Sequence, residues 1–221
     1  MLNLKETVPN IEKYPIMKII GAGKSTEKYN IKDVCTENSF LVLINYIDVI
    51  DGLTDIHDTP ILFFAHDYQN DIHPAKQPAA EAFFKKDNVY VFLHNRDVNP
   101  LLENEFILNS STDTKYLNES VSHIKNLVFY EKAQLNYKYF EESNNSLIGL
   151  SSSVHSPMSF PVGNPFIKEM HLYGLDLYIY RDLSKYDSTN CTNSHAMFNG
   201  NRNLLNYIRK KRDSLKIVFK N

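Results

Sequence analysis

The stretch IIGAGKST (residues 19–26) decides the fold, because it joins an apolar run to a tight glycine turn. The run IMKII (16–20) leads directly into the turn, which is typical of a buried strand. The letters GKS resemble the end of the phosphate-binding pattern G-x-x-x-x-G-K-[ST], but Lys18 stands where that pattern begins with glycine. The dinucleotide pattern G-x-G-x-x-G fits both glycines and meets Thr26 at its third position. The stretch predicts a strand and a glycine turn, and leaves nucleotide contact and a plain turn both open.

Further short apolar runs follow along the chain, with helical patches between them. Continuously apolar runs are typical of strands covered on both faces, and strands that alternate with helices form a parallel sheet in three layers. The predicted fold class is therefore α/β with a mostly parallel sheet. We expect strands at residues 17–20, 40–45, 60–65, 88–94, 126–130, 169–174 and 215–219, and helices at 79–86, 131–142, after Ser153 and at 199–212.

The chain of 221 residues has the length of one α/β domain, so we expect a single domain over residues 1–221. Residues 66–150 are polar and interrupt the alternation of strands and helices, which predicts a lid or acceptor-side insertion there. A net charge of −2 argues against a nucleic-acid partner. The sequence contains no secretory signal and no apolar stretch long enough for a membrane span. Its two cysteines, Cys35 and Cys191, lie far apart and give no disulfide framework, so a reducing, cytoplasmic setting is expected.

Two groups of polar and glycine residues follow the first two predicted strands. Ligands of open α/β sheets bind outside the carboxyl ends of the strands. A glycine turn there and an amide side chain on the neighbouring strand would hold the phosphate and ribose of a nucleotide. The alternative is that the amide side chain only caps its strand. The candidate residues are Gly21, Ala22, Gly23 and Ser25 after the first strand and Asn45 after the second.

A run of serines opens the predicted helix in SSSVHSPMSF (151–160). Serine is a good N-cap residue, and the amides of a helix N-terminus form an anion site. Capping alone is the alternative interpretation. The candidate residues for a phosphate or carboxylate are Ser151, Ser152, Ser153 and His155.

The segment YGLDLYIYRD (173–182) combines a strand end with a tyrosine-rich continuation. Gly174 and Asp176 are candidate substrate-binding residues. Tyr178 and Tyr180 lie two residues apart, so an extended backbone would direct them to the same side. Their hydroxyls are suitable donors to a leaving phosphate, and half-buried aromatic packing is the alternative.

His195 precedes the last predicted helix, where it is suitably placed to act as a general base. The helix ends in a basic run that is normally a solvated face, and that would also suit contact with an anionic membrane surface. The run consists of Arg209, Lys210, Lys211 and Arg212.

A metal site is not expected. His66, Asp67, Asp71 and His73 have spacings that match no ligand pattern, and no strand end carries the Asp-x-Asp of metal-dependent nucleotide-sugar transferases.

Taken in order, these segments resemble the sialyltransferases, most closely the small bacterial enzymes that use CMP-sialic acid. The resemblance covers roughly residues 16–50 and 148–210. It is carried by IIGAGKS, by SFLVLIN, by LSSSVHSPMSFPVGNPFIKEMHLYGLDLY and by SHAMFNGNRNLLNYI, in which a histidine precedes a leucine-rich helix.

The resemblance implies a Rossmann-like fold of the GT-A-variant type and a transferase of bacterial surface-glycan synthesis, such as lipopolysaccharide or capsule. An acidic sugar, sialic acid or Kdo, would move from a CMP-sugar donor to a glycan or glycolipid acceptor, with inversion and without metal or other cofactor. His195 would deprotonate the acceptor hydroxyl, and Tyr178 and Tyr180 would bind the departing phosphate. The enzyme would work in the cytoplasm or peripherally at the inner membrane.

The chain also departs from the family pattern. Ala22 stands in place of an asparagine and Gly200 in place of a glutamate. A non-catalytic nucleotide- or glycan-binding domain on the same fold is therefore the main alternative, and a different nucleotide- or pterin-binding enzyme is a further one.

Overall fold

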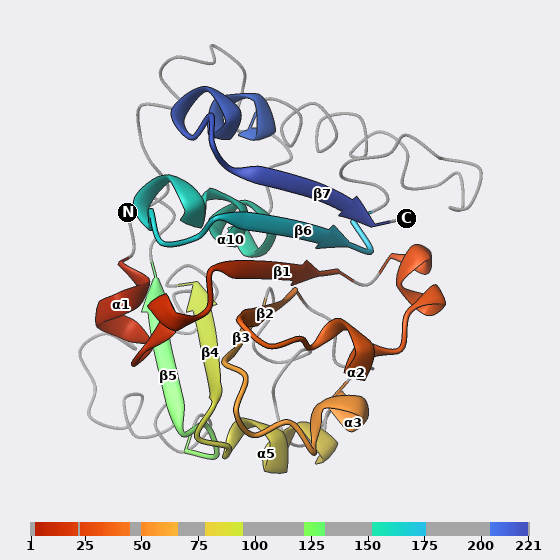
Figure 1. Ribbon diagram of the computed structural model, residues 1–221. Helices are drawn as coiled ribbons and strands as arrows, with labels where there is room; N and C mark the ends of the chain where they lie inside the picture. Colours follow the sequence, from red (N-terminus) through yellow and green to blue (C-terminus); the bar gives the residue numbers. More distant parts are fainter. Residues whose placement is uncertain are drawn as a thin grey trace, which may run out of the picture.

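A parallel sheet forms the centre of the molecule (Figure 1). The computed structural model describes residues 3–21, 23–44, 50–65, 78–94, 122–130, 152–175 and 204–220. Within these ranges the sheet has seven strands in the order β5-β4-β3-β2-β1-β6-β7, and every neighbouring pair is parallel. The strands are β1 (Ile16–Ile20), β2 (Ser39–Ile44), β3 (Ile61–Ala65), β4 (Val89–His94), β5 (Asn126–Tyr130), β6 (Glu169–Tyr173) and β7 (Lys216–Lys220).

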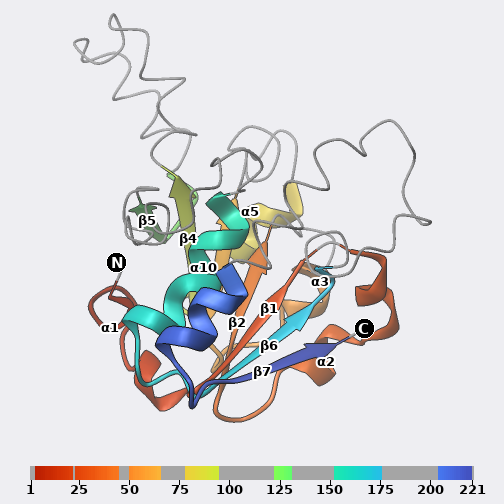
Figure 2. The ribbon, with the colours of Figure 1, turned by 90° about the horizontal axis from the view of Figure 1, so that it is seen from above.

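Helices cover both faces of the sheet, which gives the three predicted layers (Figure 2). On one face lie α2 and α3, with the buried residues of α5 in the same cluster; on the other lie α10 and a helix over residues 204–211, with α1 and η1 beside them. The helical elements are α1 (Leu4–Thr7), η1 (Ile11–Lys13), η2 (Lys24–Lys28), α2 (Ile31–Val34), α3 (Ile50–Leu53), α5 (Pro78–Phe84) and α10 (Ser152–Gly163).

The central strand β2 shows why these apolar runs form strands. All six of its residues are buried, and successive side chains enter different cores. Phe40 and Val42 belong to the core under α10, whereas Leu41 and Leu43 belong to the core under α2 and α3. A strand between two helical layers is apolar at nearly every position, and this is the pattern that predicted it.

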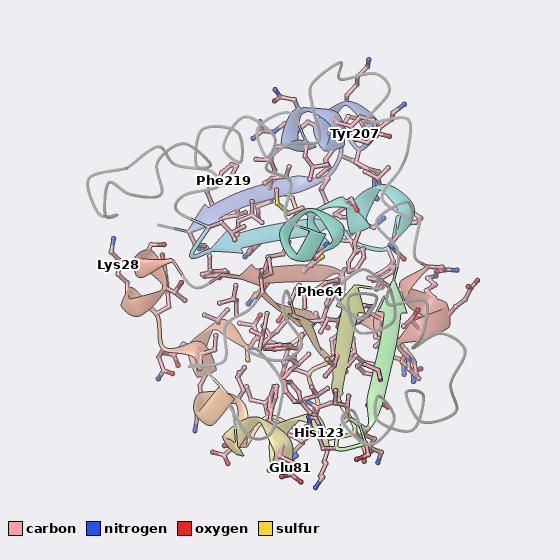
Figure 3. The ribbon with its side chains drawn as sticks, turned by 180° about the vertical axis from the view of Figure 1, so that it is seen from behind. Lys28, Phe64, Glu81, His123, Tyr207 and Phe219 are labelled. Carbon is pink, nitrogen blue, oxygen red and sulfur yellow. The ribbon has the colours of Figure 1, made fainter. Side chains whose placement is uncertain are left out.

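Aromatic side chains bind α10 to the sheet. Phe64 lies in the middle of the molecule (Figure 3) and stacks on Phe92 with ring centroids 4.6 Å apart. Phe160 of α10 packs against both rings, with centroids 5.7 and 6.4 Å away. Such pairs contribute about 0.5–1.5 kcal/mol each beyond the area they bury.

The strand order contains one reversal, between β1 and β6. From β1 the chain proceeds through β2, β3 and β4 to β5 at one edge, and it returns to form β6 on the other side of β1. Because crossovers between parallel strands are right-handed, connections that run in opposite directions place their helices on opposite faces. The reversal point at the carboxyl ends of β1 and β6 is the place where open α/β sheets bind ligands.

The fold prediction is confirmed: the architecture is Rossmann-like α/β, and each described strand boundary agrees with its expected position within one residue. Residues 78–94 and 122–130, inside the range expected to contain an insertion, form α5, β4 and β5. The rest of that range lies outside the described residues. Among the helices described, none combines the length and the apolar character that crossing a membrane requires.

Candidate functional site

The glycine turn after β1 is tied to the end of β6. The amide of Gly21 donates a hydrogen bond to the carbonyl oxygen of Tyr173 at 2.9 Å, and the amide of Gly23 donates to the carbonyl of Gly174 at 2.8 Å. These two bonds extend the β1–β6 ladder beyond the strands. Two segments about 150 residues apart in the sequence thus meet at the reversal point of the sheet.

Neither Gly21 nor Gly174 has room for a side chain. A Cβ atom on Gly21 would lie 2.7 Å from the carbonyl oxygen of Gly174, and one on Gly174 would lie 2.4 Å from the carbonyl oxygen of Gly21. Gly174 also has a φ of +61°, which disfavours any residue with a side chain. Both glycines were predicted to bind substrate, and what the structure shows is a steric requirement for glycine at both positions, the close approach of two strand ends.

Thr26 stabilises the turn through hydrogen bonds to the two glycines. Its hydroxyl lies 2.9 Å from the carbonyl oxygen of Gly21 and 2.7 Å from that of Gly23. Its amide donates to the carbonyl of Gly23 at 2.9 Å, and the residue is only 4 % exposed. The sequence pattern identified Thr26 only as a residue in place of the third glycine of G-x-G-x-x-G. That departure from the pattern was the signal that the turn differs from a dinucleotide-binding turn.

The geometry of the turn differs from a phosphate-binding loop. Gly21 uses both its amide and its carbonyl within the protein, and the amide of Gly23 donates to Gly174, the residue after β6. The segment that follows, η2, is a 3-10 helix of five residues rather than a long α-helix. The role of Gly21 is therefore to let the strands meet, and any ligand here would be bound mainly by other groups around the turn.

A pair of tyrosines lies beside this turn and was not predicted. The rings of Tyr29 and Tyr173 meet edge to face, with centroids 5.2 Å apart. Burial raises the pKa of the Tyr173 phenol, and Tyr29 adds to the effect. Tyr173 belongs to the quoted YGLDLYIYRD segment, but its strand position alone did not indicate Tyr29, the residue after η2, as a partner.

The serine segment forms the start of α10. The helix covers Ser152–Gly163, so the prediction of a helix opened by serines is confirmed. A turn of five residues connects its C-terminal end to the start of β6, and α10 packs over β2 and β3. Because α10 runs antiparallel to β6, its N-terminal end lies towards the carboxyl edge of the sheet (Figure 2). The side chains of Ser152, Ser153 and His155 lie outside the described residues.

A polar row crosses β1, β6 and β7 on the face away from α10. His171 Nε2 and Lys216 Nζ lie 2.9 and 3.1 Å from Glu169 Oε2. Burial lowers the pKa of His171 against the opposing effect of Glu169, and the bond to His171 lowers the pKa of Glu169. Lys18, the cross-strand partner of His171, is 4 % exposed and donates to Val34 O and to Thr36 Oγ1. His171 is half-buried in this network.

The basic run at the end of the last helix divides into two parts. Arg209, Lys210 and Lys211 are exposed. Arg212 is partly buried, and its guanidinium donates to the carbonyl oxygens of Pro161, Pro165 and Ile167. Arg212 thus binds the end of α10 instead of forming a solvated face with its neighbours.

Several predicted site residues lie outside the described residues, and the structure does not place them: Ala22, Asn45, Ser151, Asp176, Tyr178, Tyr180 and His195. Ser25 is 7 % exposed. In the part of the chain that is described, no three histidine, cysteine or carboxylate side chains are grouped as metal ligands would be. Comparison of the chain with family models, with curated protein sequences and with solved structures gave no match.

Proposed function

We propose that the protein is a glycosyltransferase that moves an acidic sugar, sialic acid or Kdo, from a CMP-sugar donor to a glycan or glycolipid acceptor. One observation carries the proposal. Two of the segments on which the sialyltransferase resemblance rests, residues 19–25 and 150–178, are far apart in the sequence, and the backbones of Gly21 and Gly23 bond to those of Tyr173 and Gly174 at the reversal point between β1 and β6. Ligands of this fold class bind at that position.

The arrangement suits a donor whose leaving group is already ionised. The first-turn amides of an α-helix lack partners within the helix and attract anions. The N-terminal end of α10 faces the same edge of the sheet as the glycine turn, and under this proposal its amides would bind the CMP phosphate. The reaction then needs no metal to stabilise the departing phosphate.

Three residues would perform the chemistry under this proposal. His195 accepts the proton of the acceptor hydroxyl, and the hydroxyl oxygen attacks the anomeric carbon as the bond to the CMP phosphate breaks, with inversion. Tyr178 and Tyr180 donate hydrogen bonds to the phosphate as its charge develops. These roles rest on the resemblance.

A peripheral contact with anionic lipid is part of the proposal, and three residues would make it. Arg209, Lys210 and Lys211 are exposed, whereas Arg212 is bound to carbonyl oxygens. Each exposed cation would contribute about 1 kcal/mol at an anionic surface. Co-sedimentation with anionic and with neutral vesicles tests this: binding only to anionic vesicles, lost in a triple alanine variant, is expected, and equal binding to both would contradict it.

A non-catalytic nucleotide- or glycan-binding domain is the second candidate. It is favoured by the hydrogen bonds that the Gly21 and Gly23 amides donate to Tyr173 and Gly174, because these two amides are then not available to a phosphate. Such a domain would bind its ligand without turnover.

A thermal-shift assay with CMP, CDP, UDP and GDP, followed by a turnover assay, separates the candidates. The proposal predicts a rise in Tm with CMP and release of CMP from CMP-sialic acid or CMP-Kdo in the presence of an acceptor. The double variant Ser152→Ala, Ser153→Ala should weaken CMP binding, whereas Ser214→Ala, at an exposed site in the loop before β7, should not. CMP binding without turnover would favour the second candidate, and stabilisation by another base alone would contradict both the CMP assignment and the resemblance.

A further inference from the structure

Prolines occupy every fourth position along one row of α10 and its C-terminal turn: Pro157, Pro161 and Pro165. In an α-helix the carbonyl of residue i accepts a hydrogen bond from the amide of residue i+4. Proline has no amide hydrogen. The carbonyls of Ser153, Pro157 and Pro161 therefore cannot form their regular helical bonds, and these three carbonyls lie on the same side of the helix.

Arg212 supplies a donor to the last of these carbonyls. Its Nη1 donates to the carbonyl oxygen of Pro161, and its Nη2 lies 2.9 Å from that of Ile167 and 3.3 Å from that of Pro165. The planar guanidinium carries five N–H donors in a fixed geometry, so one side chain can serve several carbonyls at once. The amide of Arg212 closes the helix over residues 204–211 by donating to Ile208 at 2.8 Å. The guanidinium therefore connects the end of that helix to the end of α10.

The other side of the same turn is also fixed. Asn164 is 1 % exposed, accepts from the amide of Leu4 at 2.9 Å and donates to the carbonyl of Phe160 at 3.0 Å. The C-terminal end of α10 is thus held from two sides. Asn164 connects it to Leu4 in the N-terminal segment, and Arg212 connects it to the C-terminal segment. A helix that lacks some of its internal hydrogen bonds depends more on such contacts for its orientation.

The orientation of α10 determines where its N-terminus lies. Twelve residues span about 18 Å, so a rotation of about 10° about the C-terminal end would move the N-terminal serines by about 3 Å. A displacement of this size is sufficient to disturb the placement of a substrate. The described contacts of the guanidinium are all at the far end of α10, at the amino edge of the sheet.

We propose that Arg212 is a positioning residue, which replaces the amide donor missing at Pro165 and thereby holds the serine-bearing N-terminus of α10 at the candidate donor site. This inference rests on the proposed function for its effect on CMP binding. Its structural part, that Arg212 controls the order of α10, can be tested independently of any ligand.

The test is a double-mutant cycle between Arg212→Ala and Pro165→Ala, with Arg212→Lys as the conservative variant. Alanine at position 165 restores an amide next to that of Asn164, which already donates to Phe160 at 2.9 Å. We expect Arg212→Ala to weaken CMP binding and raise the donor KM about tenfold, with a smaller change in kcat. Arg212→Lys should have a CMP affinity and a donor KM between those of the wild type and of Arg212→Ala. Pro165→Ala, added to Arg212→Ala, should recover part of the lost CMP affinity. Lys13→Ala, which removes an exposed cation on η1, is the control and should leave CMP affinity and the donor KM unchanged.

Hydrogen exchange of residues 152–163 provides the second readout, and it needs no ligand. Arg212→Ala should accelerate exchange in α10 more than in the strands, and the double variant should slow it again. A lower Tm with unchanged CMP affinity and unchanged exchange in α10 would overturn the inference. If the wild-type chain bound no CMP, the proposed function would fail, and the exchange data would still decide the role of Arg212.

Discussion

Gly21 and Gly174 meet backbone to backbone where β1 and β6 end, and a Cβ atom on either would come within 2.7 Å of the other's carbonyl oxygen. The contact sets the distance between the two strand ends around which the candidate site is built. Because one of the two glycines also has a positive φ, the pair makes a direct prediction about stability.

Gly174→Ala should lower the free energy of unfolding by at least about 1–3 kcal/mol, the range for a residue with a side chain held at positive φ. The added methyl would also lie 1.9 Å from Thr26 Oγ1, which should increase the loss. Urea denaturation measures the effect. Gly163→Ala, at an exposed position at the end of α10, is the matched control and should be neutral or slightly stabilising. Equal behaviour of the two variants would show that the strand ends are not in close contact.

Thr26→Val should destabilise the protein by about 1–3 kcal/mol, because it keeps the shape of the side chain but removes the one hydroxyl proton that lies between the carbonyl oxygens of Gly21 and Gly23. Thr26→Ser keeps the hydroxyl and should lose less. The comparison by chemical denaturation separates the hydrogen bonds from packing. A valine variant as stable as the wild type would mean that the hydroxyl does not hold the turn.

His171 predicts a loss of stability as the pH falls. Its pKa is lowered below the ordinary value of 6.5, chiefly by burial, while Glu169 raises it and Lys18 and Lys220 lower it further. The unfolded chain therefore takes up a proton before the folded protein does. Stability should be fully present well above about pH 6.5 and should decrease as the pH falls below that value.

His171→Gln should reduce this decrease, because the variant has no titrating imidazole in the network. Thermal unfolding at a series of pH values above about pH 5, where Glu169 contributes little, measures it. His57→Gln is the control at an exposed site. A wild-type protein equally stable at both ends of this range would contradict the role given to burial of His171.

The sequence predicted the strands because their apolar runs reflect burial on both faces, as in β2. It did not predict their order, since no local pattern records that β1 lies between β2 and β6. The same limit applies to the site. Gly21 and Gly174 were both singled out, but their contact depends on pairing between strands about 150 residues apart in the sequence.

Two side chains show how a local pattern can mislead. Lys18 lies in an apolar strand and is buried. Its ammonium group donates to Val34 of α2 and to Thr36, and these acceptors lie close to Lys18 only in the folded chain. Arg212 belongs to a basic run typical of a solvated face, yet it binds three carbonyls at the end of α10. The proline row that needs this donor was visible in the sequence, but its partner was not.

His195→Ala should reduce kcat by about 10²- to 10⁴-fold, the usual contribution of a general base, while CMP affinity stays nearly unchanged. Activity of the wild type should fall below about pH 6 as the imidazole is protonated. Steady-state kinetics with the active CMP-sugar measures both. His155→Ala is the comparison, and it should raise the donor KM instead. Near-full turnover of the His195 variant together with loss of turnover in the His155 variant would reverse these two roles.

The most direct test of the central claim is hydrogen exchange of the whole chain with and without CMP. The account predicts that CMP slows exchange in residues 152–156 at the start of α10 and in the turn over residues 23–29, which share the carboxyl edge of the sheet. Residues 164–168, at the opposite edge, should not change. UDP and GDP should have no effect at equal concentration. Protection confined to the amino edge, or no protection by CMP anywhere, would contradict the claim that a CMP-sugar binds between the ends of β1, β6 and α10.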